Sequence, residues 1–172
     1  MSVLPDVQLE GMMSRDAVIG PASQDVFLGP RLLRLPYGVT LDPERDQSAL
    51  WQDVPLRDDG RWCLGPGALY LGTTQEQIAV PDTLVGLLHG VSSLGRLGLL
   101  VHCTAGLVDP GWIGRLTLEL VSLAGSILLR PGQRIAQVTY HELASSCLRP
   151  YAGKYAGDME PVPSRMFLEH VR

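Results

Sequence analysis

The residues best placed for chemistry lie in one short segment, Leu116-Thr117-Leu118-Glu119-Leu120. Period-two alternation puts the leucines on one face of a β-strand and Thr117 and Glu119 on the other. A carboxylate inside such an apolar strand is costly unless it faces solvent, is paired or takes part in a reaction. Two interpretations follow: a solvent-facing glutamate on a sheet, or a general acid/base tuned by its surroundings.

Two glycine-rich segments precede this strand. Residues 90–98 have the sequence GVSSLGRLG, whose backbone N–H groups and paired hydroxyls suit either a phosphate cradle or a flexible polar turn. Residues 106–114 have the sequence GLVDPGWIG, which places Asp109 in a turn at the end of a strand. That aspartate is either an ordinary Asp-Pro-Gly turn residue or part of a site.

Several catalytic motifs are missing from the sequence. A zinc deaminase needs H-x-E followed by P-C-x-x-C, and the chain contains no C-x-x-C. It also lacks a P-loop, a dinucleotide fingerprint and a G-x-S-x-G elbow. We therefore expect no protein-bound metal site, since the histidines, His89, His102, His141 and His170, are not paired at ligand spacing.

Composition narrows the class of protein. The formal net charge is −4 and no Lys/Arg cluster is present, which argues against binding long nucleic acid. A few placed cations can still hold one triphosphate. The three cysteines are far apart and odd in number, so a secreted disulfide framework is not expected. No signal peptide or membrane anchor is visible, and we expect a cytoplasmic protein.

The elements that position these residues are predicted to be mostly short strands. The 172 residues include 19 glycines and 13 prolines, as expected for many strands joined by tight turns. A weak helical pattern over 1–20 stops at Pro21, residues 40–60 form a polar excursion with a turn at Asp58-Asp59-Gly60, and the tail from Ser145 lacks periodicity. This rhythm predicts a distorted barrel or sandwich. Strands are expected at 24–28, 31–35, 61–64, 68–72, 74–80, 85–88, 99–104, 116–120, 127–129 and 135–140.

Together these segments resemble the bacterial dCTP deaminases, which belong with the dUTPases to one superfamily and include bifunctional members that also cleave dUTP. The central block carries the resemblance, with further matches upstream and downstream from about residue 19. The matching segments are residues 21–29, 71–74, 80–81, 92–100, His102, 104–106, 109–111, 117–120, 131–132, Ile135, Gln137, 150–151, 154–155 and 163–165.

The resemblance implies a mainly β, jelly-roll-like dUTPase fold with a few short helices, assembled as a homotrimer with active sites between subunits. It implies one domain over 1–172, with a variable N-terminal segment over 1–18 and a tail over 145–172 that closes over the site. It further implies Mg²⁺ bound through the triphosphate rather than by a protein cage.

Carried over by position, the resemblance makes Glu119 the general acid/base for water attack on C4 of cytosine. Arg96 pairs with that carboxylate, and Ser92 positions the water or the base edge together with the backbone around Ala105. Asp109 lies near the sugar 3′-hydroxyl. The remaining substrate-binding residues are Ser93 and Thr117, with Gln137, Tyr151 and Lys154 at the triphosphate.

Deamination of dCTP to dUTP, with further cleavage to dUMP as an open second step, is the favoured function. One alternative is a dUTPase without deaminase activity, in which Asp109 activates water and Trp112 replaces the usual tyrosine. A second is a non-enzymatic nucleotide-binding relative. It is suggested by Val91, where the family has Arg or Lys, and by Asp158 and Glu160, which would repel a triphosphate.

Overall fold

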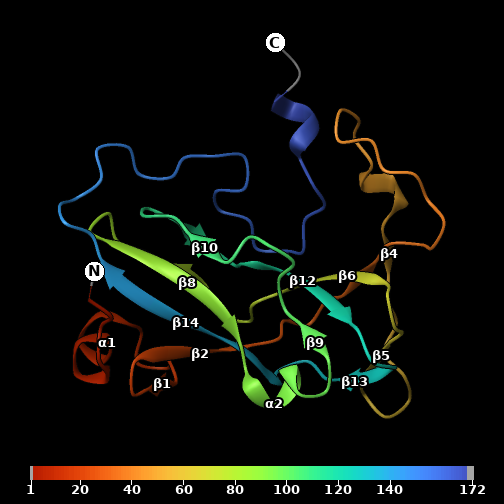
Figure 1. Ribbon diagram of the computed structural model, residues 1–172, viewed down its shortest axis with the longest axis horizontal. Coiled ribbons are helices and arrows are strands. Elements are labelled where there is room, and N and C mark those ends of the chain that lie inside the picture. The colour runs from red at the N-terminus through yellow and green to blue at the C-terminus, as the bar shows by residue number, and fades with distance from the viewer. Residues whose placement is uncertain (1, 170–172) are drawn as a thin grey trace.

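The computed structural model describes residues 2–169, in which strands far outnumber helices (Figure 1). The prediction of a mainly β protein with a few short helices is therefore confirmed. The helices are α1 (Asp6–Met12), α2 (Ser92–Gly95), η1 (Ser48–Leu50) and η2 (Met166–Glu169). The strands are β1 (Ile19–Gly20), β2 (Ser23–Phe27), β3 (Leu33–Arg34), β4 (Gln52–Asp53), β5 (Trp62–Leu64), β6 (Leu69–Thr73), β7 (Ile78–Ala79), β8 (Leu84–Gly90), β9 (Leu99–Leu100), β10 (Leu107–Val108), β11 (Ile113–Gly114), β12 (Thr117–Ser122), β13 (Ile127–Leu129) and β14 (Arg134–Glu142).

The strands pair into four sheets. Two have five strands, in the orders β1-β2-β14-β8-β10 and β4-β3-β6-β12-β9, and two are the pairs β11-β7 and β13-β5. The named strands pair antiparallel throughout. Over residues 2–169 this backbone pairing does not close a barrel. The distorted barrel or sandwich expected from the sequence is therefore present as four separately paired sheets, without a closed barrel in the described residues.

Strand β12 anchors the candidate site to the core. It pairs with β6 from Thr117↔Thr73 to Val121↔Leu69, and its far end pairs with β9. Leu118 and Leu120 are 0% exposed, while Thr117 and Glu119 are half-buried on the opposite face. The alternation predicted for this segment is confirmed, and it presents Glu119 away from the leucines.

Three predicted strands are much shorter in the structure, and the third, expected over 99–104, is β9 (Leu99–Leu100). The strand expected over 74–80 is reduced to β7, because the Thr74 hydroxyl donates to the Glu76 carbonyl at 2.7 Å and accepts the Leu116 N–H at 3.0 Å. These bonds bend the chain before Ile78. The strand expected over 31–35 is reduced to β3. The predicted turn at Asp58-Asp59-Gly60 is present, and Gly60 has a φ of +71°.

The helices are short. Helix α1 ends at Met12, well before Pro21, where the helical pattern was expected to stop. Leu9 is its buried residue, and the helix packs beside β1 and β2. Within residues 2–169 no helix has the length and apolar character needed to cross a membrane.

Candidate active site

The Glu119 carboxylate is held by the segment that follows β9. Its Oε2 accepts the backbone N–H of Cys103 at 2.8 Å, and its own N–H donates to the Val101 carbonyl at 3.1 Å. The first of these bonds explains why the strand expected over 99–104 ends at Leu100. The Cys103 N–H group turns toward the Glu119 side chain instead of pairing with a neighbouring strand. The half-buried carboxylate therefore has one fixed donor.

The Cys103 thiol lies beside this carboxylate. Partial burial, and then the negative charge of Glu119 and a hydrogen bond to it, raise the pKa of the thiol above its ordinary value. The thiolate is the reactive form of cysteine. These surroundings therefore disfavour the thiolate of Cys103, even though the residue is exposed.

Replacing Glu119 by glutamine should speed the alkylation of Cys103. Removing the charge lowers the pKa of the thiol, so we expect iodoacetamide at pH 8 to modify Cys103 about threefold faster in the variant. Mass spectrometry of tryptic peptides measures the rate at each cysteine. Cys63, which is exposed on β5, is the control and should react equally fast in both proteins. Equal rates at Cys103 would contradict the contact.

Three of the predicted residues lie on helix α2 or directly after it. Ser92 and Ser93 form its first turn, Arg96 follows its end, and all three side chains are exposed. Val91 is half-buried and packs against the core. The ion pair expected between Arg96 and Glu119 is not among those formed within the described part of the chain.

Gln137 lies near the start of α2. It is on β14, where Ala136 pairs with Gly90 and Gln137 with His89. Its side-chain oxygen accepts the Ser23 hydroxyl at 3.4 Å and Nη2 of Arg134 at 3.5 Å. Gln137 and the hydroxyls of α2 thus belong to one region of the subunit.

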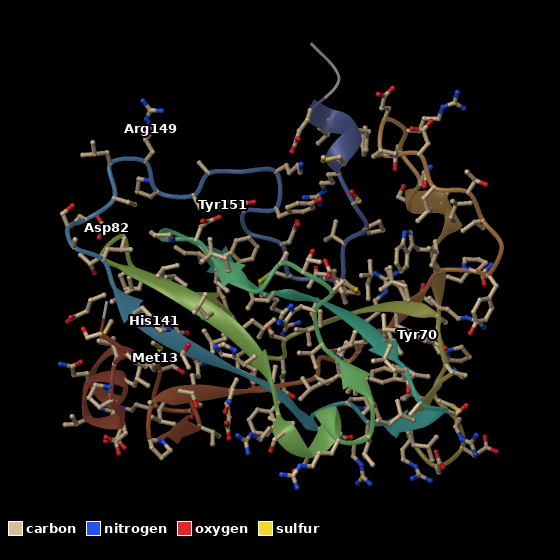
Figure 2. All side chains as sticks on the ribbon, in the orientation of Figure 1. Met13, Tyr70, Asp82, His141, Arg149 and Tyr151 are labelled. Atoms are coloured by element: carbon tan, nitrogen blue, oxygen red, sulfur yellow. The ribbon has the colours of Figure 1, made fainter. Side chains whose placement is uncertain are left out.

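The Asp109 turn contacts the C-terminal segment. The Tyr151 N–H donates to the Pro110 carbonyl at 2.8 Å, and the Tyr151 and Trp112 rings pack with centroids 5.4 Å apart. Gly111 has a φ of +86°, and a Cβ there would lie 2.5 Å from Cβ of Pro150. Figure 2 shows Tyr151 lying over the strands while Arg149 projects away from them. Asp109 and Ala105 are themselves exposed.

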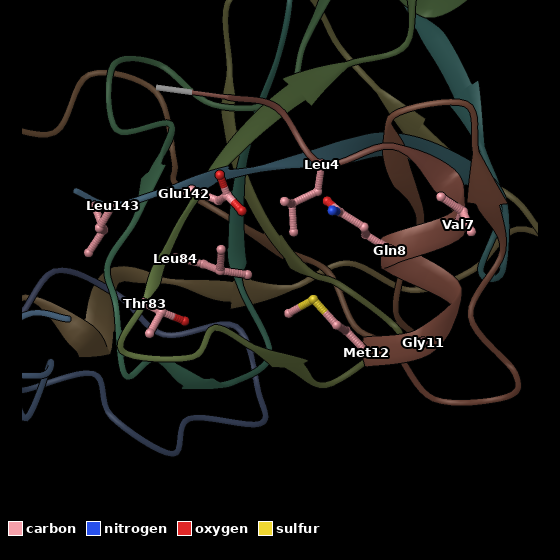
Figure 3. Close-up of a pocket in the computed structure, with 9 residues that line it drawn as sticks. All are labelled: Leu4, Val7, Gln8, Gly11, Met12, Thr83, Leu84, Glu142 and Leu143. Carbon is pink, nitrogen blue, oxygen red and sulfur yellow. The ribbon is translucent and has the colours of Figure 1, made fainter. Parts of the chain in front are cut away.

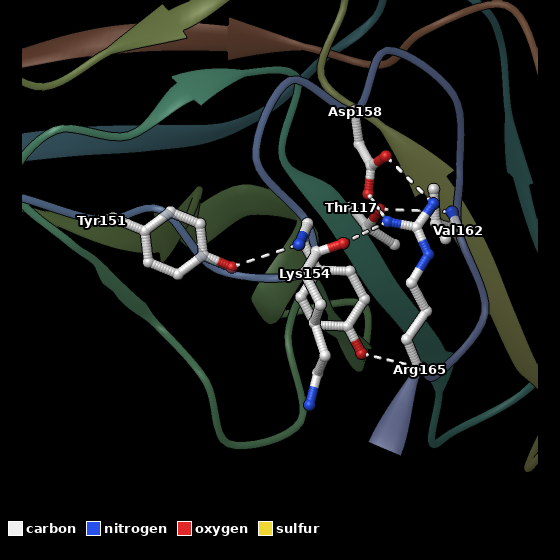
Figure 4. Close-up of polar contacts among 7 residues, drawn as sticks. Thr117, Tyr151, Lys154, Asp158, Val162 and Arg165 are labelled. Atoms are coloured by element: carbon white, nitrogen blue, oxygen red, sulfur yellow. Dashed lines mark hydrogen bonds and ion pairs between the residues drawn. The ribbon is translucent and has the colours of Figure 1, made fainter. Parts of the chain in front are cut away.

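The acidic residues of the tail are paired. Asp158 binds Arg165 with both carboxylate oxygens, at 3.0 and 3.1 Å (Figure 4). Oε2 of Glu160 lies 3.7 Å from Nη1 of Arg31. The repulsion expected between these two carboxylates and a triphosphate is therefore reduced by neighbouring guanidinium groups.

Two more predicted residues contact the tail: Lys154, which lies in the tail itself, and Thr117 on β12. The Lys154 ammonium forms an ion pair with Glu169, whose hydrogen bond raises the pKa of that ammonium. The Thr117 hydroxyl accepts the Val162 N–H at 3.4 Å. The tail thus reaches the strand face that carries Glu119.

The predicted residues form two groups. In Figure 1 helix α2 lies at the lower side of the molecule and the tail runs along the upper side, above β8 and β10. Glu119 belongs with the tail, because it shares a face of β12 with Thr117, which the tail contacts. The first group is Ser92, Ser93, Arg96 and Gln137; the second is Ala105, Asp109, Thr117, Glu119, Tyr151 and Lys154.

Two contributors were not identified from the sequence as site residues. Cys103 acts through its backbone N–H, which leaves no signal in residue type. Arg165 stands in a segment that supports the family resemblance, but its partner Asp158 was interpreted only as a repulsive charge. An arginine seven residues from an aspartate in an aperiodic tail does not by itself indicate a pair.

One cavity lies away from these residues. A cavity of about 540 Å³ opens between α1, the turn before β8 and the end of β14 (Figure 3). Glu142 is its one ionisable lining residue, and it accepts the Ser2 hydroxyl at 2.5 Å. A cavity that shares no residue with either group is not where we place the chemistry.

Among residues 2–169, no three His, Cys, Asp or Glu side chains gather closely enough to hold a metal ion. His89 and His141 both hydrogen-bond the Thr139 hydroxyl, at 3.3 and 3.0 Å. Nδ1 of His102 is buried without a hydrogen-bond partner in the structure. His170 lies outside the described residues.

Known proteins resemble this chain in sequence and in fold. The sequence model of a family described as dCTP deaminase-like matches residues 6–143. The dUMP-forming dCTP deaminase of Methanopyrus kandleri is 42% identical over 165 residues, covering 91% of this chain and 85% of that protein. The dCTP deaminase of Haloarcula marismortui is 38% identical over 170 residues, covering 94% of this chain and 87% of that protein.

One solved structure shares the fold. The 2′-deoxycytidine 5′-triphosphate deaminase of Agrobacterium tumefaciens matches 80% of this chain with a TM-score of 0.64 and 22% identity. The present chain spans 46% of the length of that protein. The likeness therefore concerns the arrangement of strands.

Proposed function

The chain belongs to the dCTP deaminase-like family, and from this premise we propose that it hydrolyses dCTP to dUTP and ammonia. We further propose that it cleaves dUTP to dUMP and diphosphate, because relatives 42% and 39% identical are named as dUMP-forming. The whole chain, 1–172, is proposed to act as one domain in deoxynucleotide metabolism, in the cytoplasm.

The observation that carries the proposal is the placement of Glu119. Its carboxylate lies on the half-buried face of β12 with the Cys103 N–H as a fixed donor. In the proposed reaction, Glu119 takes a proton from water as the oxygen attacks C4 of cytosine, giving a tetrahedral centre. The same proton then passes to the amino nitrogen, and the electron pair on N3 expels ammonia. The proton of the new C4 hydroxyl moves to N3, which gives the C4 carbonyl of uracil.

The other side chains are proposed to bind and orient the nucleotide. Arg96 holds the Glu119 carboxylate, and Ser92 holds the attacking water with the backbone at Ala105. Asp109 receives the sugar 3′-hydroxyl, with Ser93 and Thr117 nearby. Gln137, Tyr151 and Lys154 hold the triphosphate, over which the tail, 145–172, closes.

Magnesium is proposed to arrive with the nucleotide. The described residues offer no cluster of three acidic or histidine ligands, so the donors that suit this ion are phosphate oxygens and water. When bound there, Mg²⁺ neutralises charge on the triphosphate. The deamination step is proposed to be zinc-independent, since the sequence lacks the zinc deaminase motifs.

The site is proposed to form between subunits of a homotrimer. The separation of α2 from the tail supports a site whose two groups come from different copies. Leucines with 60%, 39% and 64% exposure, Leu97, Leu100 and Leu123, also gather around α2 and β9, where a second copy would cover them.

Mixed trimers test this arrangement. Arg96→Ala and Glu119→Gln should each be inactive alone, whereas coassembled from equal amounts they should regain about one quarter of the wild-type rate, because random mixing gives one interface in four with both native groups. Differently tagged subunits allow the mixed species to be purified and assayed. A mixture as inactive as either parent would contradict a shared site.

Product analysis tests the function itself. The protein is incubated separately with dCTP and dUTP in Mg²⁺, and the nucleotides are separated by anion-exchange chromatography. We expect dCTP to give dUMP, diphosphate and ammonia, and dUTP to give dUMP. Consumption of dUTP alone would instead support the dUTPase with Asp109 at its centre. No change in either nucleotide would contradict both enzymatic functions.

A further inference from the structure

Arg165 joins several residues of the C-terminal segment, and we call Arg165 together with its partners Tyr155 and Asp158 the hub. Its guanidinium binds both oxygens of Asp158, at 3.0 and 3.1 Å, and donates from Nη1 to the backbone carbonyl of Lys154. Its carbon Cζ lies 5.6 Å from the centre of the Tyr155 ring, and its backbone N–H donates to the Tyr155 hydroxyl at 2.8 Å. Figure 4 shows these contacts converging on one half-buried side chain.

The hub is fixed to the strands beside the candidate site. The Asp158 carbonyl accepts the Arg115 N–H at 2.8 Å, and the Gly157 N–H donates to the Ile113 carbonyl at 3.0 Å. Three residues before Arg165, the Val162 N–H binds the Thr117 hydroxyl. Thr117 shares a strand face with Glu119, so Arg165 ties the tail to the face that carries the proposed acid/base.

Lys154 receives its position from this hub. A lysine side chain has four rotatable bonds, and ordering it costs conformational entropy. The bond from Arg165 to its carbonyl fixes the backbone from which that side chain starts. The Lys154 ammonium already forms an ion pair with the Glu169 carboxylate, and the Lys154 side chain is 22% exposed.

We infer that Arg165 is a positioning residue, which places Lys154 to meet the terminal phosphates of dCTP and does not contact the nucleotide itself. The inference rests on the proposed function, because Lys154 is a phosphate ligand only there. The fork of Arg165 is engaged by Asp158, and a planar bidentate pair of this kind fixes geometry better than a point charge. Asp158 thus becomes part of the mechanism that orders the tail.

A double-mutant cycle tests the inference through binding. In the Glu119→Gln background, where turnover is blocked, calorimetry gives the Kd of dCTP in Mg²⁺ for Lys154→Ala, Arg165→Gln and the double variant. Loss of one charge-assisted phosphate contact should weaken each single variant about tenfold. The double variant should also be weakened only about tenfold, because residues that act through one contact are not additive.

Controls separate positioning from general loss of structure. Arg61→Gln removes another arginine that binds an aspartate, Asp59, and should leave the Kd unchanged. Deoxycytidine, which has no phosphate, should bind the Arg165→Gln and parent proteins equally. Arg165→Lys keeps the charge but loses the fork, and should bind dCTP as weakly as Arg165→Gln.

The inference would be overturned by unchanged dCTP binding in Arg165→Gln, by an additive loss of about a hundredfold in the double variant, or by equal weakening for deoxycytidine. Unchanged binding in Lys154→Ala would do the same. If neither the parent nor the wild-type protein binds dCTP, the proposed function fails and takes the inference with it. The two failures are therefore distinguishable.

Discussion

Glu119→Gln is expected to lower kcat for dCTP deamination by about 10²–10⁴-fold, the usual contribution of a general acid/base. Glutamine keeps the size of the side chain and an oxygen that accepts the Cys103 N–H, but it cannot take a proton from water. The KM for dCTP should therefore change little. Initial rates of ammonia release over a range of dCTP concentrations give both parameters.

The matched control is another glutamate on a strand. Glu142 is exposed at the end of β14 and bonds Ser2, so Glu142→Gln should retain full activity. The melting temperature of Glu119→Gln should stay close to that of the wild type, since the hydrogen bond is kept. A kcat within a few fold of the wild type would remove Glu119 from the chemistry.

Leu118→Ala is expected to lower the free energy of unfolding by about 2–5 kcal/mol, as do other leucine truncations in closed cores. Leu118 is 0% exposed and lies on the buried face of β12, behind Thr117 and Glu119. The loss has two sources, the transfer of the removed methyl groups and the cavity left behind. Urea unfolding at a single protein concentration measures it, because the proposed assembly would make stability depend on concentration.

Leu128→Ala is the control for this effect. Leu128 is also a strand leucine, on β13, but it is 38% exposed. Its truncation should cost well under half as much, because its site is open to solvent. Equal shifts of the two unfolding midpoints would contradict the closed packing of Leu118 in the core.

The sequence predicted best where one rule dominated. In β12 the alternation of leucines with Thr117 and Glu119 has a single interpretation, and burial confirms it. It predicted less well where side chains bind the backbone. The Thr74 hydroxyl and the Glu119 carboxylate take backbone N–H groups that a strand would need, and neither bond has a periodicity to detect.

The tail was the least predictable part. Its aperiodic sequence predicts no helix or strand, and the charge of Asp158 by itself predicts repulsion of a triphosphate. Its order comes from contacts with distant residues, such as the packing of Tyr151 on Trp112 and the Arg115 N–H bond to Asp158. Such contacts depend on the folded position of β11 and β12, which composition and spacing do not encode.

The central claim, hydrolytic attack at C4 of dCTP, is tested most directly by isotope transfer. The reaction is run in water enriched in ¹⁸O, and the nucleotide product is analysed by tandem mass spectrometry. We expect the wild-type protein to introduce one ¹⁸O atom into the uracil base, and Glu119→Gln to introduce none. Unchanged dCTP, or a product whose base carries no label, would contradict it.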